Sequence, residues 1–158
     1  MAIYLDTETT GFSPASGATL VEIAIVDEDG RALIDTLIDP RRPIPPGAQQ
    51  VHGISDSMVR GKPTLEQVLP AVRDVVAGQE VVIYNAAFDT AFFPDRLGEA
   101  RAVSCAMLRF ADVLGGKWRK LDVAASHAGH RWTGTAHRAL ADALACRTVW
   151  RWLEARKR

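Results

Sequence analysis

The chain has 158 residues, of which 47% are apolar and 24% are charged, and its mean hydropathy is −0.02. This composition can fill a hydrophobic core, which excludes disordered and fibrous proteins, and the length predicts a single domain over residues 1–158. The net charge is zero, but residues 1–100 carry 15 acidic and 7 basic side chains, whereas residues 101–158 carry 4 and 12. Such a distribution can place a surface that attracts polyanions beside carboxylates that hold cations, with ordinary surface charge as the alternative.

The start of the chain and its cysteines bear on location. The first ten residues contain two acids and no long apolar run, so neither a signal peptide nor a membrane span is expected. Cys105 and Cys146 have neither the spacing of a metal site nor the number needed for a disulfide framework. We therefore expect two buried thiols and a cytoplasmic protein.

Three strands are predicted near the start of the chain, over residues 2–5, 20–26 and 31–38. Apolar, largely β-branched runs indicate strands, and the acidic turn at residues 27–30 separates the last two. Because their connections are short, an antiparallel meander is favoured. Four prolines in residues 40–47 exclude a helix or a central strand there and predict a surface connection.

Helices dominate the remaining predictions. Residues 64–78 are typical of a helix, with Thr64 and Gln67 as a capping box and Gly78 as the stop. Residues 80–84 predict a strand that can pair in parallel with the first one, because a long helix precedes it. The result is a mixed α/β sheet. Further helices are predicted after Asn85 as a cap and over residues 106–114, 121–128 and 136–155.

Two acids follow the first predicted strand. Asp6 and Glu8 are two residues apart, so in an extended chain both carboxylates point to the same face of the sheet. Their repulsion would raise the pKa of one of them unless a cation lay between, and carboxylate oxygens suit Mg²⁺ or Mn²⁺. A solvated turn is the alternative, since Thr7, Thr9 and Gly11 also fit one.

Two more acids lie in mainly apolar helical segments. Asp142 shares an apolar face of the last predicted helix. Because burial of an unpaired carboxylate is costly, Asp142 either pairs with Arg138 four residues earlier or coordinates a metal. Asp89, within the apolar segment NAAFDTAFF, presents the same choice, with an exposed helical acid as the alternative.

A histidine is predicted at the entrance of the last helix. His137 lies about 140° from Asp142 around an ideal helix, so the two cannot share one stripe. An imidazole with a reference pKa near ~6.5 can accept a proton from water as a general base, whereas a surface or capping histidine is the alternative. His127 and His130 have no further metal ligands near them in sequence and are expected to be structural or exposed.

Four segments occur in one order over nearly the whole chain: DTETTG (residues 6–11), VHGIS (51–55), NAAFD (85–89) and HRALAD (137–142). Together they resemble the DEDDh branch of 3′-to-5′ exonucleases, which includes the proofreading subunit of bacterial replicative DNA polymerase, ribonuclease T and exonuclease X. The resemblance implies an α/β fold of the ribonuclease H type, in which helices flank a five-stranded mixed sheet. It also implies release of nucleoside 5′-monophosphates from the 3′ end of single-stranded DNA or short RNA.

The resemblance further implies the roles of individual side chains. Asp6, Glu8, Asp89 and Asp142 would surround two divalent cations, Mg²⁺ or Mn²⁺, and His137 would be the general base. Two such cations lower the pKa of the attacking water and neutralise charge on the leaving 3′ oxygen.

Five further positions match those that line the terminal nucleotide in this family: Thr9, Phe12, Val51, His52 and Phe88. An apolar side chain at Phe12 would lie against or between the last bases, and such stacking contributes ~1–3 kcal/mol per base with little dependence on sequence. Core packing is the alternative for Phe12 and Phe88.

Two features of this chain bear on how it compares with individual members of the family. The chain stops at Arg158, without the extension by which the proofreading subunit holds its polymerase, so polymerase association is not expected. Residues 105–131 are most similar to exonuclease X. The basic side chains Lys117, Arg119 and Lys120, which flank Trp118, are either phosphate contacts or solvated surface.

Two other functions stay open. The DTETT segment superficially resembles the D-x-D-x-T motif of haloacid-dehalogenase phosphatases, but Glu8 replaces the second aspartate, and a phosphomonoesterase leaves His137 and Asp142 unexplained. A nucleic-acid-binding module without turnover is disfavoured by the five expected catalytic side chains. The sequence decides neither between DNA and RNA nor between a monomer and a homo-oligomer.

Overall fold

The computed structural model describes residues 1–157, and its centre is a five-stranded sheet with the strand order β3-β2-β1-β4-β5. The strands are β1 (Ala2–Thr9), β2 (Leu20–Val26), β3 (Ala32–Leu37), β4 (Glu80–Ile83) and β5 (Ala102–Cys105). β1, β2 and β3 pair antiparallel, whereas β4 runs parallel to β1 and to β5. The predicted mixed sheet, with three antiparallel strands followed by parallel ones, is confirmed.

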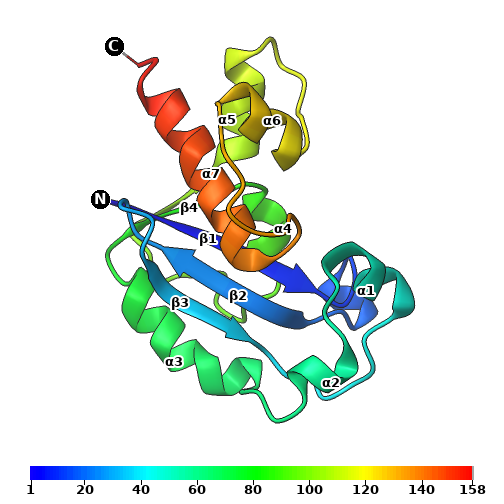
Figure 1. Cartoon of the computed structure of the whole chain (residues 1–158). Helices are drawn as coiled ribbons and strands as arrows, with labels where there is room; N and C mark the ends of the chain where they lie inside the picture. The colour runs from blue at the N-terminus through cyan, green and yellow to red at the C-terminus, as the bar shows by residue number, and fades with distance from the viewer. Residues whose placement is uncertain (158) are drawn as a thin grey trace.

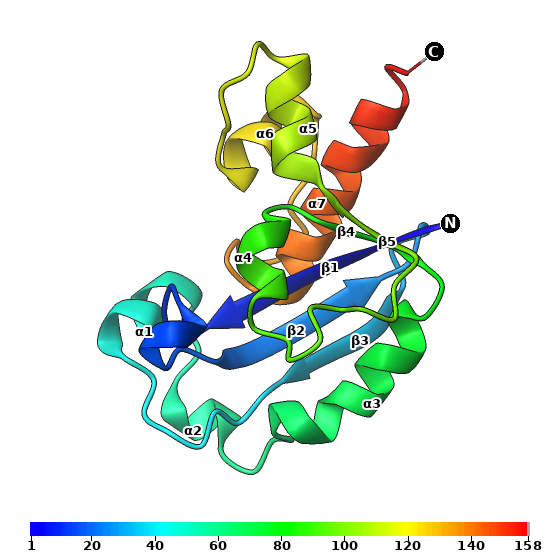
Figure 2. The ribbon, with the colours of Figure 1, turned by 180° about the vertical axis from the view of Figure 1, so that it is seen from behind.

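Helices cover both faces of the sheet (Figures 1 and 2). α3 lies on one face, and α5, α6 and α7 lie on the other, where α7 packs across β1 and β2. The helices are α1 (Pro46–His52), α2 (Asp56–Val59), α3 (Leu65–Val76), α4 (Ala86–Thr90), α5 (Ala106–Val113), α6 (Leu121–His127) and α7 (Ala139–Glu154), together with the short 3₁₀ helix η1 (Pro14–Ser16). Within residues 1–157 none of them has the length and apolar character that crossing a membrane requires.

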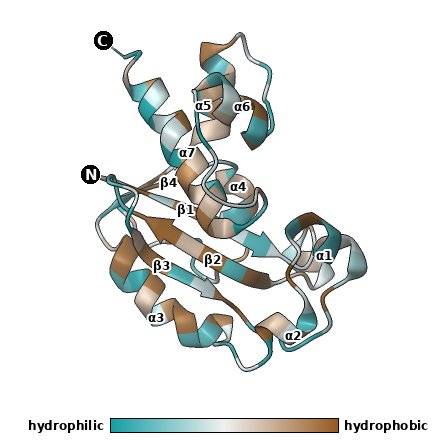
Figure 3. Cartoon of the chain, viewed as in Figure 1, coloured by the Kyte–Doolittle hydropathy of each residue, from teal (hydrophilic) through white to brown (hydrophobic). Residues whose placement is uncertain are grey.

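The side chains of the central strands alternate between two cores. Tyr4 and Ala24 pack on the side of α7, whereas Ile3 and Leu5 pack on the side of α3. This is the two-residue period of a strand that is covered on both faces, and β2 is accordingly coloured as mostly hydrophobic in Figure 3. Because the even-numbered residues of β1 face α7, the side chain of Asp6 belongs to the face that this helix covers.

α3 begins as its sequence predicts. The Gln67 backbone N–H donates to the Thr64 hydroxyl at 3.4 Å, and the Thr64 N–H donates to the Gln67 side-chain oxygen at 2.9 Å. This reciprocal pair satisfies two of the backbone donors that a helix start leaves free.

Several boundaries differ from the sequence predictions. The predicted surface connection becomes α1 at Pro46, since proline is compatible with the first helical position. α7 starts at Ala139 rather than at residue 136, because His137 has a φ of 64°, which no right-handed helix accommodates. Asn85 precedes α4 but makes no capping hydrogen bond through its side chain.

The two cysteines are free thiols, and the two histidines outside the motifs contact other side chains of the protein. Cys146 is buried, Cys105 is partly buried, and both are free thiols. His127 is exposed and contacts Phe110 edge-on, while His130 Nδ1 lies 2.7 Å from the Thr148 hydroxyl. These positions agree with the structural or exposed role expected for both histidines.

Candidate active site

Three carboxylates, two from β1 and one from the distant helix α7, converge at the end of β1. One oxygen from each of Asp6, Glu8 and Asp142 lies within 4.8 Å of the corresponding oxygens of the other two. β1 supplies the first two acids on its α7 side, and the first turn of α7 supplies the third. The strand alternation and the crossing of α7 over β1 therefore bring together three of the four acids that the family resemblance implies.

Asp89 joins the cluster from α4. It is 5% exposed, and its Oδ1 accepts a hydrogen bond of 2.6 Å from the Thr7 hydroxyl. Thr7 stands between Asp6 and Glu8 in β1, so this bond ties α4 to the strand that carries two of the other acids. The alternative of an exposed helical acid is wrong for Asp89.

Burial and mutual repulsion raise the pKa values of all four acids. Burial, followed by the charge of Asp89, raises the pKa of Asp6 well above its ordinary value. Burial, with Asp142 nearby, raises the pKa of Glu8 to about 9. Burial likewise raises the pKa of Asp89 to about 7 and that of Asp142 to about 6. Without cations, four ionised carboxylates at this position are unfavourable.

The donor set fits divalent cations. Asp6 Oδ2 is buried and has no hydrogen-bond partner within the protein, although buried polar atoms are normally satisfied. Clustered carboxylate oxygens are the ligands that Mg²⁺ and Mn²⁺ prefer. Asp6, Glu8 and Asp142 would hold such ions directly, with Asp89 beside them.

The metal-free protein is expected to lose stability as the pH rises from 7 to 9. A carboxyl group whose pKa is raised by folding keeps its proton in the native state after the unfolded chain has lost it, so the free energy of unfolding falls as the pH rises from the unfolded pKa of ~4 to the folded pKa. Glu8, with a folded pKa of about 9, continues this decline between pH 7 and 9, whereas the contribution of Asp89, with a folded pKa of about 7, is largely complete at the start of the window, and burial lowers the pKa values of His52 and His130 below 6.5.

Melting temperatures in EDTA and in Mg²⁺ at both pH values test this expectation. Mg²⁺ at one hundred times its dissociation constant should add about 2.7 kcal/mol and should abolish most of the decline. A melting temperature in EDTA that is constant or rises between pH 7 and 9 would contradict it.

His137 lies immediately before α7, beside the acids. Its side chain is exposed, and its backbone N–H donates to Asp142 Oδ1 at 3.1 Å. Histidine is among the residues that tolerate a positive φ, and this conformation separates His137 from the helical residues that follow. The backbone of His137 is thus bonded to an acid of the cluster, while its side chain remains open to solvent.

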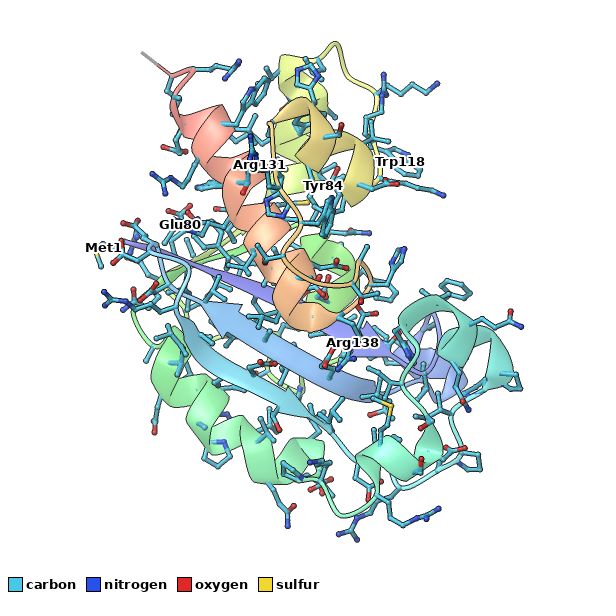
Figure 4. All side chains as sticks on the ribbon, in the orientation of Figure 1. Met1, Glu80, Tyr84, Trp118, Arg131 and Arg138 are labelled. Atoms are coloured by element: carbon cyan, nitrogen blue, oxygen red, sulfur yellow. The ribbon has the colours of Figure 1, made fainter. Side chains whose placement is uncertain are left out.

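A fifth carboxylate, that of Glu22, was not singled out by its sequence pattern. It is 4% exposed and stands opposite Glu8 in the pairing of β1 with β2. Arg138 donates to it through Nε and Nη2, the latter at 2.7 Å, and the Ala139 N–H donates to Glu22 Oε1 at 2.7 Å. The alternative in which Arg138 pairs with Asp142 is therefore wrong, because the Arg138 guanidinium bonds to Glu22 in β2. Arg138 is labelled in Figure 4.

Glu22 holds the start of α7 on the sheet. The bond from Ala139 satisfies a backbone donor in the first turn of the helix, where a negative charge is also favourable. The signal that would have revealed Glu22 is a single acid in the otherwise apolar strand LVEIAIV.

A Glu22→Gln variant is expected to lower the free energy of unfolding by about 1–3 kcal/mol, because a neutral amide replaces the charged acceptor of several buried hydrogen bonds. The matched control is Glu154→Gln, which removes exposed ion pairs with Arg109 and Lys157 and should cost at most about 1 kcal/mol. Denaturant titration of both variants measures the difference; equal costs would mean that Glu22 does not secure α7.

Comparison with known proteins assigns the chain to a family. The family model RNase_T, which describes an exonuclease, matches residues 3–149. The chain belongs to this exonuclease family. The resemblance that the four segments indicated is thereby confirmed.

Similar proteins extend this assignment. The exonuclease is 38% identical over 161 residues to "Uncharacterized exonuclease CP81" of Escherichia phage 186, covering 89% of this chain and 81% of the relative. It is 39% identical over 98 residues to DNA polymerase III subunit epsilon of Pasteurella multocida, covering 57% of this chain and only 39% of that subunit.

Solved structures share its fold. A structure of exonuclease X in complex with 5′ overhanging duplex DNA aligns with a TM-score of 0.80 and 27% identity over 100% of this exonuclease and 94% of that chain. A structure of E. coli exonuclease I with a dA16 oligonucleotide has a TM-score of 0.79 at 16% identity, over 99% and 41% of the two chains, and supports the fold alone. The ribonuclease H-like architecture is confirmed.

Two apolar side chains of this exonuclease that the sequence matched to the terminal nucleotide are open to solvent. Phe12, in the loop after β1, is 94% exposed, so core packing is the wrong interpretation for it, and Val51 at the end of α1 is 55% exposed. α1 lies beside the turn that follows β1 (Figure 1). Phe88 is partly buried and contacts Phe92, with the ring centroids 5.2 Å apart.

Thr9 and His52 form the link between β1 and α1. The His52 Nδ1 accepts from the Ile54 N–H at 3.0 Å, so the proton is on Nε2, which donates to the Thr9 carbonyl at 3.1 Å. The Thr9 hydroxyl donates to the Gly11 carbonyl at 2.6 Å. Both ring nitrogens of His52 are therefore used within the protein, and its imidazole positions the α1 end against the strand.

Proposed function

We propose that this exonuclease releases nucleoside 5′-monophosphates from the 3′ end of single-stranded DNA or short RNA, using two divalent cations. The observation that carries the proposal is the convergence of Asp6, Glu8 and Asp142 within 4.8 Å, with the buried Asp89 beside them. When bound, the two cations would lower the pKa of a water molecule and neutralise the charge that develops on the leaving 3′ oxygen.

The acids and His137 have distinct tasks in this proposal. Asp6, Glu8 and Asp142 supply the oxygen ligands of the ions, and Thr7 orients Asp89 towards them. The exposed imidazole of His137 takes the proton from the attacking water, a task that requires access to solvent. The His137–Asp142 backbone bond keeps the base beside the ligands.

The exposed apolar residues suit the terminal nucleotides. Phe12 and Val51 would contact the last bases through their faces, and Phe88 would border the terminal sugar next to Asp89. Contacts of this kind tolerate any base, as an enzyme that shortens ends requires. The presence of 5′ overhanging duplex DNA in the exonuclease X structure supports DNA as one class of substrate.

A matched set of 5′-labelled single-stranded DNA, duplex DNA and RNA of one sequence tests the proposal. With Mg²⁺ or Mn²⁺, we expect stepwise shortening from the 3′ end and nucleoside 5′-monophosphate as the product. EDTA should stop the reaction. Absence of shortening on every substrate with both metals would reject the proposal.

Two other results of these assays would favour one of the alternative functions. Tight binding of oligonucleotides without cleavage would favour a binding module of the same fold. Release of inorganic phosphate from a 3′-phosphorylated oligonucleotide, with the chain length unchanged, would favour a phosphomonoesterase.

A further inference from the structure

The loop between α5 and α6, residues 114–120, carries an exposed aromatic side chain among three cations. Trp118 is 60% exposed and is flanked by Lys117, Arg119 and Lys120. None of the four ion pairs found within residues 1–157 involves these basic residues. The loop therefore presents positive charge that the described part of the protein does not pair.

Local hydrogen bonds constrain the backbone of the 114–120 loop, although most of its residues are exposed. Gly115 and Gly116 have φ values of 95° and 91°, which other residues rarely adopt, and the Gly116 N–H donates to the Ala111 carbonyl at 2.6 Å. The Arg119 guanidinium donates to the carbonyls of Lys117 and Trp118, at 2.9 and 3.2 Å. An indole held on a closed loop loses little freedom when it binds.

A tyrosine side chain connects this loop to the end of the sheet where the acids lie, through a hydrogen bond. The Tyr84 hydroxyl donates to the Arg119 carbonyl. Tyr84 directly follows β4, whose Ile83 pairs with Leu5, the residue before Asp6. In the view of Figure 4, Tyr84 appears between Trp118 and Arg138, the residue that precedes α7.

We propose that the 114–120 loop binds the single-stranded part of the substrate a few nucleotides upstream of its 3′ end, with Trp118 stacked on a base and Lys117 and Lys120 on phosphates. This proposal rests on the proposed function. An exposed aromatic ring among cations matches the alternating bases and phosphates of a single strand, and stacking of this kind is independent of sequence. The loop would give longer substrates an affinity that the acidic site alone does not provide.

The test compares substrates with and without upstream nucleotides. The p-nitrophenyl ester of thymidine 5′-monophosphate occupies only the terminal site, whereas an oligothymidylate of about 16 nucleotides can reach the loop. Trp118→Ala should raise KM for the oligonucleotide about 5- to 150-fold and leave turnover of the ester unchanged, and Trp118→Phe should restore most of the loss.

The phosphate contacts proposed for Lys117 and Lys120 are tested by measuring how the affinity for the oligonucleotide depends on salt concentration. The double variant Lys117→Ala, Lys120→Ala should reduce the slope of log affinity against log salt concentration by about 1.4, from ~0.7 for each phosphate contact. Arg101→Ala is the matched control: Arg101 is exposed, and it precedes β5 at the opposite end of the parallel strands. It should leave the slope unchanged.

An unchanged oligonucleotide KM in Trp118→Ala, or an equal loss on the ester, would overturn the role of the loop. Fluorescence anisotropy of labelled oligothymidylate in EDTA measures the same affinity without turnover. If the wild-type protein cleaved neither substrate, the proposed function would fail, while the anisotropy of Trp118→Ala would still decide whether the loop binds a single strand.

Discussion

An Asp6→Asn variant is expected to release nucleotides about 10³-fold more slowly than the wild-type protein. A bound metal contributes several kcal/mol to the transition state, and about 1.4 kcal/mol corresponds to a tenfold change in rate. Asp6 has the strongest claim of the four acids, because it belongs to the three-carboxylate group and its Oδ2 has no partner within the protein. Initial rates on a labelled oligonucleotide measure the loss of activity. Titration with Mg²⁺ or Mn²⁺ by calorimetry measures the loss of cation affinity.

The same substitution should stabilise the metal-free fold at neutral pH, since the amide is neutral without the proton uptake on folding that the raised pKa of Asp6 requires. Activity and stability thus change in opposite directions, which a general unfolding of the variant cannot produce. Asp74→Asn, an exposed acid on α3 across the sheet, is the control and should alter neither. A variant that lost activity but kept full cation affinity would contradict the role of Asp6 as a ligand.

A His137→Asn variant is expected to lose about 10²- to 10⁴-fold in turnover, the range typical of a general base, while it keeps its affinity for Mg²⁺. Asparagine adopts positive φ values about as readily as histidine, so the backbone at a φ of 64° and the N–H bond to Asp142 should persist. Any loss then reports the imidazole rather than the loop.

His137→Ala provides the comparison at the same position. Equal turnover in the two variants would show that the ring itself is responsible, and calorimetry should give wild-type Mg²⁺ affinity for both. Loss of cation binding in His137→Asn, or a rate within a few fold of the wild-type protein, would contradict the assignment of His137 as the base.

Local patterns predicted most of the elements that carry the site. The strand at Leu20–Val26 and the capped start of α3 follow from short-range preferences that tertiary contacts do not oppose. The parallel pairing of β4 with β1 follows from the helix between them. The two-residue spacing of Asp6 and Glu8 was sufficient to place both acids on one face of the sheet, and the structure shows that α7 covers this face.

The parts that were missed depend on contacts between distant residues. α1 begins inside a proline-rich segment that excludes helix by composition, yet its last residue is fixed by the bond from His52 to Thr9, 43 positions away in the chain. Glu22 and Arg138 are 116 residues apart, so the nearer Asp142 was the natural partner from sequence. A helix pattern also cannot show that a positive φ at His137 delays the start of α7.

The bond between Glu22 and Arg138 has a consequence for charge stoichiometry. Four carboxylates match the four positive charges of two divalent ions, but Glu22 lies opposite Glu8 and would add a fifth negative charge. Arg138 neutralises it, and Arg138 is the residue next to His137. If the proposed function holds, this dipeptide would supply both the proton acceptor and the counter-charge that leaves a centre with two bound cations electrically neutral, so that an arriving phosphodiester would meet no surplus negative field.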